Sequence, residues 1–557
     1  MLEIKNTGRD FMFHGNVVTM PQRQNISQTI LQQLSNWGVK TIYGYAGDSI
    51  LSFLAAIAEQ NNIKFVSTKN EEAAALMASA EAKLTGNMAV CLAHAGPGCA
   101  HLINGLADAY LDRVPVLAIT GQVESEFIGT DHKQYIDQQG LFKSVTSYTN
   151  LITSPLSLVN TLNKAIKTAI SQKTVSHISI PKDYFILESV EPPRPAEPYL
   201  TTAPISSPDV INGAISKLNQ AQRPVIIIGR GAWGQTEAVQ QLSEKWGAAV
   251  VNTLAGTGVV PHQFPFAVGG FGLAGTGAAK EVLNNADMVL RLGATWWPEK
   301  YVHRELRIVQ VDSEPASIGS PVPVEYGVVG QVSDILPTLI NGINPTMRSN
   351  WRQYIEDQKL QWQQLINQET AVKPGEPITP PMVMKAIQDS IYDNALIALD
   401  TGNHSVWFGR DFQASHQNVL LSGKWRTMGF GLPAANSAAI NQPGRQVVAI
   451  VGDGCLNMQL AELTTTAQLN QPITIVVLKN NMLGMEKGRM HVAEMPQLGV
   501  DLYNPDFTSV AEACGIKAWQ INDSALLYDA VHQAMASNKP SLVEVSVHEL
   551  IPPGLTM

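Results

Sequence analysis

Short apolar runs alternate with amphipathic segments along most of the chain. In the first third, mostly apolar runs lie at 41–45, 64–67, 88–93 and 116–120, and the segments between them carry apolar residues at helical spacing. Strands that alternate with helices predict a parallel sheet covered by helices on both faces. Ligands of such sheets bind at the carboxyl ends of the strands, and polar or glycine-rich turns follow these runs.

The same alternation recurs twice downstream. A strand at 225–228 leads into Gly229 and Gly231, and later strands are expected at 395–399 and 541–547. The turn at Gly229 lacks the third glycine of the dinucleotide fingerprint, so a nucleotide site and a purely structural domain both remain open for the middle region. The chain is therefore predicted to be an α/β protein with three doubly wound parallel-sheet domains.

Two proline-rich stretches without hydrophobic period, at 192–208 and 374–381, mark the domain boundaries. The first is predicted to be an extended linker. The predicted division is an N-terminal arm at 1–24, a first domain at 25–191, a linker at 192–208, a central domain at 209–345, a linker region at 346–381 and a last domain at 382–557.

Composition narrows the class of partner. A chain of 557 residues is too long for one core, and its net charge of −9 without a basic stretch argues against nucleic acid or an anionic membrane as partner. The four cysteines show no metal-ligand spacing, which favours a reducing compartment, and no apolar run has the length of a signal or a membrane span. We therefore expect a cytoplasmic protein.

The most informative stretch is a predicted βαβ unit near the carboxyl end. A strand at 447–451 ends at Gly452-Asp453-Gly454, a helix is expected at 456–469, and a second strand at 473–478 leads to Asn480. Because a right-handed crossover brings the ends of parallel strands to one edge, Asp453 and Asn480 are expected to meet there. A carboxylate and an amide oxygen beside a helix N-terminus suit Mg²⁺ shared with phosphate, although the same turn alone fits an ordinary loop equally well.

A GDG turn, 25 residues and then Asn480 resembles the signature of thiamine-diphosphate-dependent enzymes. The resemblance implies that Asp453, Asn480 and the backbone carbonyl of Met482 hold Mg²⁺ on the cofactor's diphosphate. Lys479 stands where the family commonly has Asn, and Asn481 is not implied as a ligand.

The segment TKNEEAAALMASAEAKLTG in the first domain resembles the helix start that carries the catalytic glutamate of this superfamily. Alignment on AKLTG implies Glu71 for that role, with Glu72 as the neighbouring candidate. The implied chemistry is a carboxylic acid beside the aminopyrimidine N1′, where it assists removal of the thiazolium C2 proton. The alternative is a first-turn acid that the helix dipole favours.

Roughly residues 25–550 resemble the branch of pyruvate oxidases and acetolactate synthases. The resemblance implies that the three domains are, in chain order, pyrimidine-binding, central nucleotide-binding-like and diphosphate-binding. HAGPGCAHLINGLADAYLDRVPVLAITGQ, IVQVDSEPASIG and PQLGVDLYNPDF look most like pyruvate oxidases, whereas VESEFIGTDHKQY and WRTMGFGLPAA look like acetolactate synthases. The leading interpretation is oxidative decarboxylation of pyruvate or a related 2-oxoacid with electrons passing through FAD. The alternative is a carboligase of acetolactate synthase type, in which FAD is absent or structural. The resemblance also implies FAD as a cofactor, although the segment 294–297 lacks the Asp/Arg pattern of many flavin-binding relatives, a pattern that not all pyruvate oxidases have.

Several residues carry the rest of the expectation. Arg489 stands where synthases place Trp and pyruvate oxidases place Glu; it could bind a carboxylate or phosphate, or be a solvated helix residue. His94, Gln122 and Gln134 are polar groups that the family would place near substrate, and each could instead cap a loop. The resemblance further implies a homo-oligomer, a dimer of dimers, with sites shared between subunits. In full, the implied residues are Glu71, Gln122 and Met485 for catalysis; Gly47, Gly402, Asn403, His404, Met428, Gly452, Gly454, Cys455 and Leu483 for thiamine diphosphate; Asp453, Asn480 and Met482 for Mg²⁺; and His94, Gln134 and Arg489 for substrate.

Overall fold

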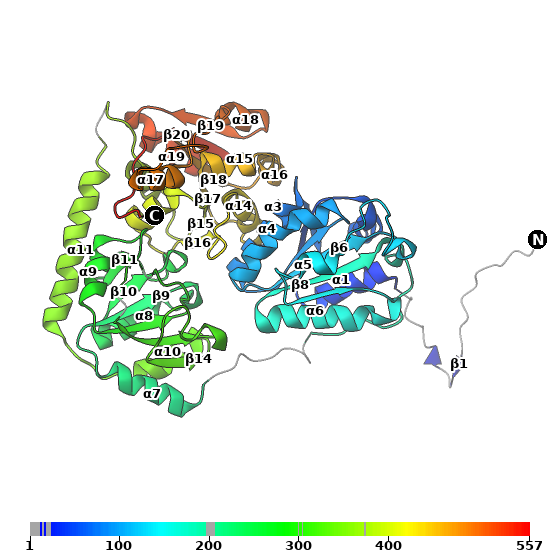
Figure 1. The fold of residues 1–557 in the computed structure, drawn as a ribbon, viewed down its shortest axis with the longest axis horizontal. Coiled ribbons are helices and arrows are strands. Elements are labelled where there is room, and N and C mark those ends of the chain that lie inside the picture. Colours follow the sequence, from blue (N-terminus) through cyan, green and yellow to red (C-terminus); the bar gives the residue numbers. More distant parts are fainter. Residues whose placement is uncertain are drawn as a thin grey trace, which may run out of the picture.

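The computed structural model describes residues 24–196, 206–298, 300–302, 305–372 and 375–556, and the backbone of 12–13 and 16–17 (Figure 1). The two short segments, Met12–Phe13 (β1) and Asn16–Val17 (β2), pair as an antiparallel hairpin. The rest of the expected arm before residue 24, and much of the expected linker at 192–208, lie outside the described residues.

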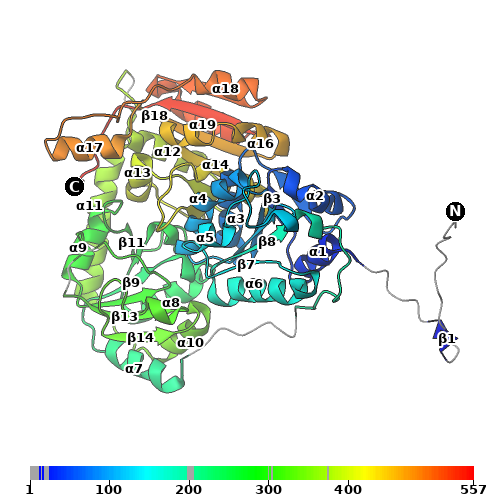
Figure 2. The same cartoon turned by 45° about the vertical axis from the view of Figure 1, so that its right-hand side comes forward.

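Three six-stranded sheets form within the described ranges, and every strand pair in them is parallel. Helices cover both faces of each sheet (Figures 1 and 2). This confirms the predicted fold class of three α/β domains. The buried runs are rich in Val, Ile and Leu because strands covered on both faces have no solvent side.

The first and third sheets share one topology. The first has the order β4-β3-β5-β6-β8-β7 and the third has β16-β15-β17-β18-β20-β19, so each reads 2-1-3-4-6-5 when its strands are counted within its own domain. The strands are Thr41–Gly44 (β3), Lys64–Ser67 (β4), Ala89–Ala93 (β5), Val116–Gln122 (β6), Tyr148–Leu151 (β7), Val175–Pro181 (β8), Leu396–Leu399 (β15), Asn418–Leu421 (β16), Val447–Gly452 (β17), Ile473–Lys479 (β18), Lys517–Ile521 (β19) and Ser541–Ser546 (β20).

The central sheet has the order β11-β10-β9-β12-β13-β14, which reads 3-2-1-4-5-6 within the domain. That is the order of dinucleotide-binding folds, whose ligands lie beyond the carboxyl ends of the strands where the order reverses. Its strands are Pro224–Ile228 (β9), Ala249–Asn252 (β10), Ala267–Gly270 (β11), Met288–Leu292 (β12), Arg307–Asp312 (β13) and Tyr326–Val329 (β14).

The helices follow the strands in alternation, and no described helix is long and apolar enough to cross a membrane. They are Ile26–Asn36 (α1), Leu51–Ala58 (α2), Glu71–Thr85 (α3), Pro97–Leu111 (α4), Gln138–Phe142 (α5), Leu158–Gln172 (α6), Pro208–Leu218 (α7), Thr236–Trp246 (α8), Gly277–Asn285 (α9), Val332–Gly342 (α10), Ser349–Glu369 (α11), Pro380–Ser390 (α12), Asn403–Asp411 (α13), Gly431–Asn441 (α14), Asp453–Met458 (α15), Glu462–Leu469 (α16), Gly484–Val492 (α17), Phe507–Ala513 (α18) and Leu527–Met535 (α19).

The helix expected over 456–469 is two helices. The first, α15, already begins at Asp453, and it ends where Gln459 leaves helical dihedral angles at φ −126° and ψ 26°. The break re-aims α16, so that the Glu462 carboxylate accepts the Lys69 N–H of the first domain at 2.6 Å. Periodicity within the segment carries no trace of that contact, which lies 393 positions away in the sequence.

The region 346–381, expected to be a linker, contributes to the central core. Helix α11 buries Trp351 and Ile355 in that core, and the Trp351 indole donates to the Pro224 carbonyl at 3.1 Å. The polar composition of α11 concealed this because only Trp351, Ile355 and Ile366 of its residues are buried.

The first and third domains pack through α3 and α14. Leu76 and Ala80 of α3 belong to the same buried cluster as residues of the third sheet, and Ser437 of α14 donates to the Met77 carbonyl at 2.8 Å. At the other end of α3, Lys83 forms buried ion pairs with Asp108 at 2.6 Å and Asp112 at 2.8 Å. This contact fixes where α3 lies, and with it the glutamate at its start.

Candidate active site

The GDG turn and the end of β18 lie together at the carboxyl edge of the third sheet. Asp453 is 3% exposed, and its Oδ2 accepts the N–H of Asn481 at 2.6 Å and the N–H of Asn480 at 3.2 Å. Its Oδ1 accepts the Gly454 N–H at 2.9 Å. Burial raises the pKa of Asp453, and these N–H groups oppose the rise. The carboxylate thus links the GDG turn to the loop after β18.

Asn504 is a member of this cluster that the sequence analysis missed. Its amide donates to Asp453 Oδ2 at 2.8 Å and to Asn481 Oδ1 at 2.9 Å. Asn481 has a left-handed φ of 55°, so this bond also secures a backbone conformation that costs energy outside glycine. Asn504 lies in the segment PQLGVDLYNPDF, which resembles pyruvate oxidases, and that resemblance was the only sign in the sequence that this segment belongs to the site.

Buried polar side chains lie beside the GDG turn, at the start of α13. His404 is 5% exposed, and burial lowers its pKa to about 4, so the ring is neutral at pH 7. A Cβ on Gly452 would lie 3.1 Å from His404 Nδ1, which explains the glycine. His404 Nε2 and Asn403 Oδ1 are buried without a hydrogen-bond partner among the described residues. Gly402 precedes them, and Cys455 Sγ donates to the Thr401 carbonyl at 3.1 Å.

Met428 and Leu483 flank the same turn. A Cβ on Gly454 would lie 3.1 Å from Met428 Cε and 3.3 Å from Leu483 Cδ2, so any side chain there would compress both. Asp400 holds the loop that carries Met428, since its carboxylate accepts the N–H of Gly429 at 3.0 Å. Met482 lies next in the loop, where its N–H donates to Asn480 Oδ1 at 3.3 Å, and Met485 stands in the first turn of α17.

The first domain presents Glu71 at the start of α3. Asn70 caps that helix through the Glu72 N–H, and the Glu71 side chain is 8% exposed. Its Oε2 lies 2.9 Å from His101 Nδ1, and a Cβ on Gly98 would lie 2.8 Å from its Oε1. Glu72 is engaged elsewhere.

Glu72 accepts the Asn104 amide at 2.6 Å, and that amide also donates to Thr427 of the third domain at 2.9 Å. The Trp425 indole N–H donates to Asn104 Oδ1 at 2.6 Å. The two neighbouring glutamates therefore have different surroundings: Glu72 belongs to a domain contact, whereas Glu71 lies against a glycine and a histidine.

The remaining polar residues of this edge take loop roles in the structure. Gln122 is 1% exposed; its amide donates to the Ile136 carbonyl at 3.1 Å, and its Oε1 accepts the N–H of Val123 at 2.9 Å. These bonds match the loop-capping alternative. Gln134 has a left-handed φ of 64°, and its side chain is exposed.

His94 lies directly over Gly47, where a Cβ would stand 2.4 Å from His94 Cβ. Its Nδ1 is 3.4 Å from Ser49 Oγ, and burial lowers its pKa. In the third domain, the Arg489 side chain on α17 is half-exposed, and its Nη1 lies 4.0 Å from Glu486 Oε1. In the single chain, Arg489 is therefore a solvated helix residue.

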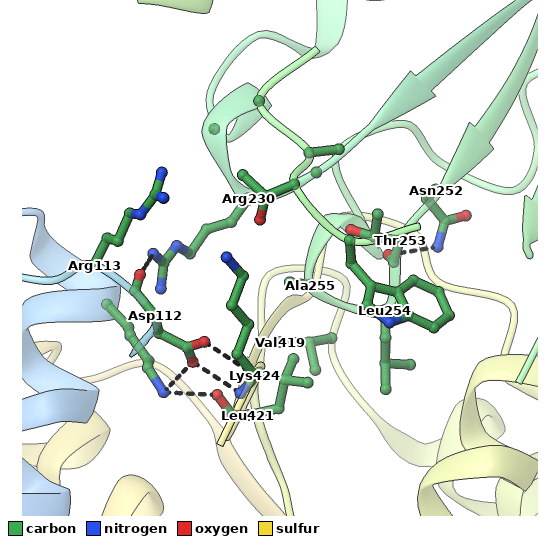
Figure 3. A pocket seen from close by; sticks show the side chains of 18 of the residues that line it. Asp112, Arg113, Arg230, Asn252, Thr253, Leu254, Ala255, Val419, Leu421 and Lys424 are labelled. Atoms are coloured by element: carbon green, nitrogen blue, oxygen red, sulfur yellow. Dashed lines mark hydrogen bonds and ion pairs between the residues drawn. The ribbon is translucent and has the colours of Figure 1, made fainter. Parts of the chain in front are cut away.

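A separate cavity of about 490 Å³ lies where the three domains meet. It is bounded by the glycine turns after β9 and β12, by Asp312 at the end of β13, and by the loop after β16. Figure 3 shows Arg230 of the central domain beside Asp112 of the first, and Arg230 donates to the Asp112 carbonyl at 2.6 Å. The Asp112 carboxylate in turn accepts the Lys424 N–H of the third domain at 2.8 Å.

The residues of the third edge fit thiamine diphosphate with a hard cation. Asp453, Asn480 and the Met482 backbone carry oxygen atoms of the kind that Mg²⁺ prefers, at the start of a helix whose N–H groups suit phosphate. His404, which has an unpartnered buried Nε2, lies beside the same turn, and Asn403, which has an unpartnered buried Oδ1, lies beside Gly484. Glycines at 402, 452 and 454 let His404, Met428 and Leu483 pack against the backbone there.

Comparison with known proteins accounts for this arrangement. Residues 24–141 match the family model of the thiamine pyrophosphate enzyme N-terminal TPP binding domain, 211–339 that of the central domain and 400–545 that of the C-terminal TPP binding domain. Thiamine pyrophosphate is another name for thiamine diphosphate.

Whole-length relatives point to the same family. A putative thiamine pyrophosphate-containing protein YdaP of Bacillus subtilis (strain 168) is 34% identical, over 93% of this chain and 91% of its own. The probable acetolactate synthase large subunit of Methanocaldococcus jannaschii is 30% identical, over 95% of this chain and 93% of its own. The acetolactate synthase isozyme 1 large subunit of Escherichia coli (strain K12) is 28% identical, over 95% of this chain and 96% of its own. The chain therefore belongs to the thiamine pyrophosphate enzyme family, in the branch of pyruvate oxidases and acetolactate synthases, and is a thiamine-diphosphate-dependent enzyme.

Proposed function

We propose that this enzyme is a carboligase of acetolactate synthase type, which decarboxylates pyruvate or a related 2-oxoacid and transfers the two-carbon unit to a second 2-oxoacid or another carbonyl acceptor. The observation that carries the proposal is end-to-end similarity to acetolactate synthase large subunits from several organisms. This reverses the order of the two activities expected from the sequence motifs, where the oxidase led.

The cofactor, when bound, supplies the nucleophilic carbon that adds to the 2-oxo group and stabilises the charge left by loss of CO₂. The chain's residues hold and orient it. Asp453, Asn480 and the Met482 carbonyl are the proposed Mg²⁺ ligands. Met428 and Leu483 pack beside the turn that receives the diphosphate, and their contact with Gly454 supports a role in setting the cofactor's shape.

Glu71 is the proposed acid that exchanges a proton with the cofactor's N1′. Its burial, and the glycine beside its Oε1, support this role over Glu72, whose carboxylate is committed to Asn104. We further propose that His94 and Arg489 face the substrate, although Arg489 would have to turn from solvent. We propose that Gln122 acts in the same site by holding the loop after β6 through its hydrogen bonds to Ile136 and Val123.

We propose that each site is shared between two subunits of a homodimer. In both views α17, which begins beside the Mg²⁺ ligands, lies on the side of the third domain away from α3 (Figures 1 and 2). Large apolar side chains are exposed on both half-sites, including Tyr45 and Leu51 in the first domain and Leu498 and Tyr503 in the third. A two-fold axis that apposes the two edges would cover these side chains and build two sites.

The cavity between the domains supports an adenine dinucleotide, FAD, as a second cofactor. It lies at the switch point of a sheet with dinucleotide-binding order, and Lys173, Arg230 and Lys424 among its lining residues suit a diphosphate. The same cavity keeps pyruvate oxidation as the second candidate function, because a flavin there could accept electrons.

One experiment separates the two activities. Purified enzyme with thiamine diphosphate, Mg²⁺ and pyruvate is followed by product NMR and by its visible spectrum. Acetolactate formation with an unbleached flavin band, or with no flavin band, supports the carboligase. Acetate formation with bleaching of a flavin band under anaerobic conditions would replace it by the oxidase.

The shared site has its own test. Inactive Glu71→Gln chains are mixed with inactive Asp453→Ala chains under conditions of subunit exchange, which mass spectrometry verifies. Hybrid dimers contain one site built from two intact halves, so part of the activity should return. Verified exchange without activity refutes sharing.

A further inference from the structure

The contact between Glu71 and His101 is the closest polar contact of the proposed acid. His101 Nδ1 lies 2.9 Å from Glu71 Oε2, while Oε1 faces Gly98, where a Cβ would intrude to 2.8 Å. Gly98 and His101 both belong to the first two turns of α4, which packs along α3. Helix α4 thus places a glycine against one oxygen of the carboxylate and an imidazole against the other.

In the single chain, Glu71 and His101 differ in their access to solvent. The Glu71 side chain is 8% exposed, whereas the His101 side chain is 51% exposed. Protein covers most of the Glu71 carboxyl, which limits its direct proton exchange with water. His101 offers a second route, since its Nδ1 meets the carboxyl oxygen and about half of its side chain is exposed.

Imidazole is suited to such a position because its two nitrogens can take up a proton on one side and release one on the other. The neighbouring pair shows what a purely positional contact looks like in this fold. One turn along α4, the Asn104 amide holds Glu72 at 2.6 Å, and an amide cannot change its protonation state.

We propose that His101 is a positioning residue for Glu71 that also carries protons between this buried carboxyl and solvent. This rests on the proposed role of Glu71. In the outward direction, the O–H bond of the Glu71 carboxylic acid breaks and an N–H bond forms at Nδ1, giving carboxylate and imidazolium; the Nε2 proton then passes to water and leaves a neutral ring. The return direction reverses these steps, and no electrons are exchanged with any other group.

The test uses the full-length holoenzyme and the exchange of the cofactor's C2 proton in D₂O, followed by acid quench and NMR. His101→Asn places a donor where Nδ1 stood and removes Nε2, so it keeps the positioning and deletes the relay. We expect thiamine diphosphate affinity, measured by calorimetry, within about threefold of wild type, and exchange slowed by about tenfold or more. The slowed rate should rise with the concentration of a small buffer such as imidazole, which the wild-type rate should not.

Two controls make the outcome unambiguous. His532→Asn changes an exposed histidine of α19 that stacks on Tyr528, and it should exchange like wild type. Glu71→Gln reports on the underlying role: if it exchanges at the wild-type rate, the assignment of Glu71 fails, independently of His101. If Glu71→Gln is slow, a His101→Asn enzyme that exchanges at the wild-type rate, or one whose slow exchange ignores buffer concentration, overturns the relay.

Discussion

Asp453 has two separable roles, and substitution should reveal both. Its Oδ2 accepts the Asn481 N–H at 2.6 Å and the Asn504 amide at 2.8 Å. Hydrogen bonds to a charged group contribute about 1.5–3 kcal/mol each. Asp453→Ala should therefore destabilise the junction between the GDG turn and the loop after β18 by about 3–6 kcal/mol, before any effect on the metal.

The measurement is backbone hydrogen–deuterium exchange of the segment 480–484 in the apoenzyme, together with calorimetric titration of thiamine diphosphate in magnesium. We expect faster exchange in this segment and loss of more than about 100-fold in affinity, because a metal ligand and its loop are both lost. Lost affinity in Asp453→Ala alone would not identify a metal ligand, since a disordered loop gives the same result.

Asn504→Ala provides the matched control. It removes one bond to the same oxygen but leaves the carboxylate, so affinity should fall by about 10-fold, as for groups that orient a ligand. Wild-type hydrogen exchange in the 480–484 segment of apo Asp453→Ala would refute the loop-holding role of Asp453. A loss of affinity in Asn504→Ala as large as that in Asp453→Ala would refute its role as a metal ligand.

Three further outcomes follow from other sites. Glu71→Gln should keep cofactor affinity but slow C2 proton exchange by roughly 10²–10⁴, and a larger defect in Glu72→Gln would transfer the role. Lys83→Met should lower the free energy of unfolding in urea by about 3–5 kcal/mol, because buried carboxylates lose their partner; adding Asp108→Asn should recover part of it, and a loss below about 1 kcal/mol would contradict the buried ion pair. Burial lowers the pKa of His404 from 6.5 to about 4, so between these pH values the unfolded chain binds a proton that the folded chain does not. Stability should fall as pH drops through this window, and His404→Gln should flatten the urea midpoint there.

Local pattern was sufficient for the fold class. The buried strands are short, continuous apolar runs, and most helices repeat their apolar positions over a few residues, so both patterns report burial. Alternation of the two patterns, together with the handedness of the crossover, predicted parallel sheets and predicted that Asp453 and Asn480 meet at one edge. The roles assigned to Glu71 and to the metal ligands came from resemblance and stay predictions.

Tertiary structure decided what depends on partners distant in the sequence. The break between α15 and α16, the burial of α11, the bond from Asn504 to Asp453 and the pairing of His101 with Glu71 all join segments whose local composition is unremarkable. A period of two or 3.6 residues shows which side of an element is buried, but it does not show which residue of another element meets it. Such contacts form only when helices and sheets pack, and in this enzyme they determine the surroundings of each proposed catalytic group.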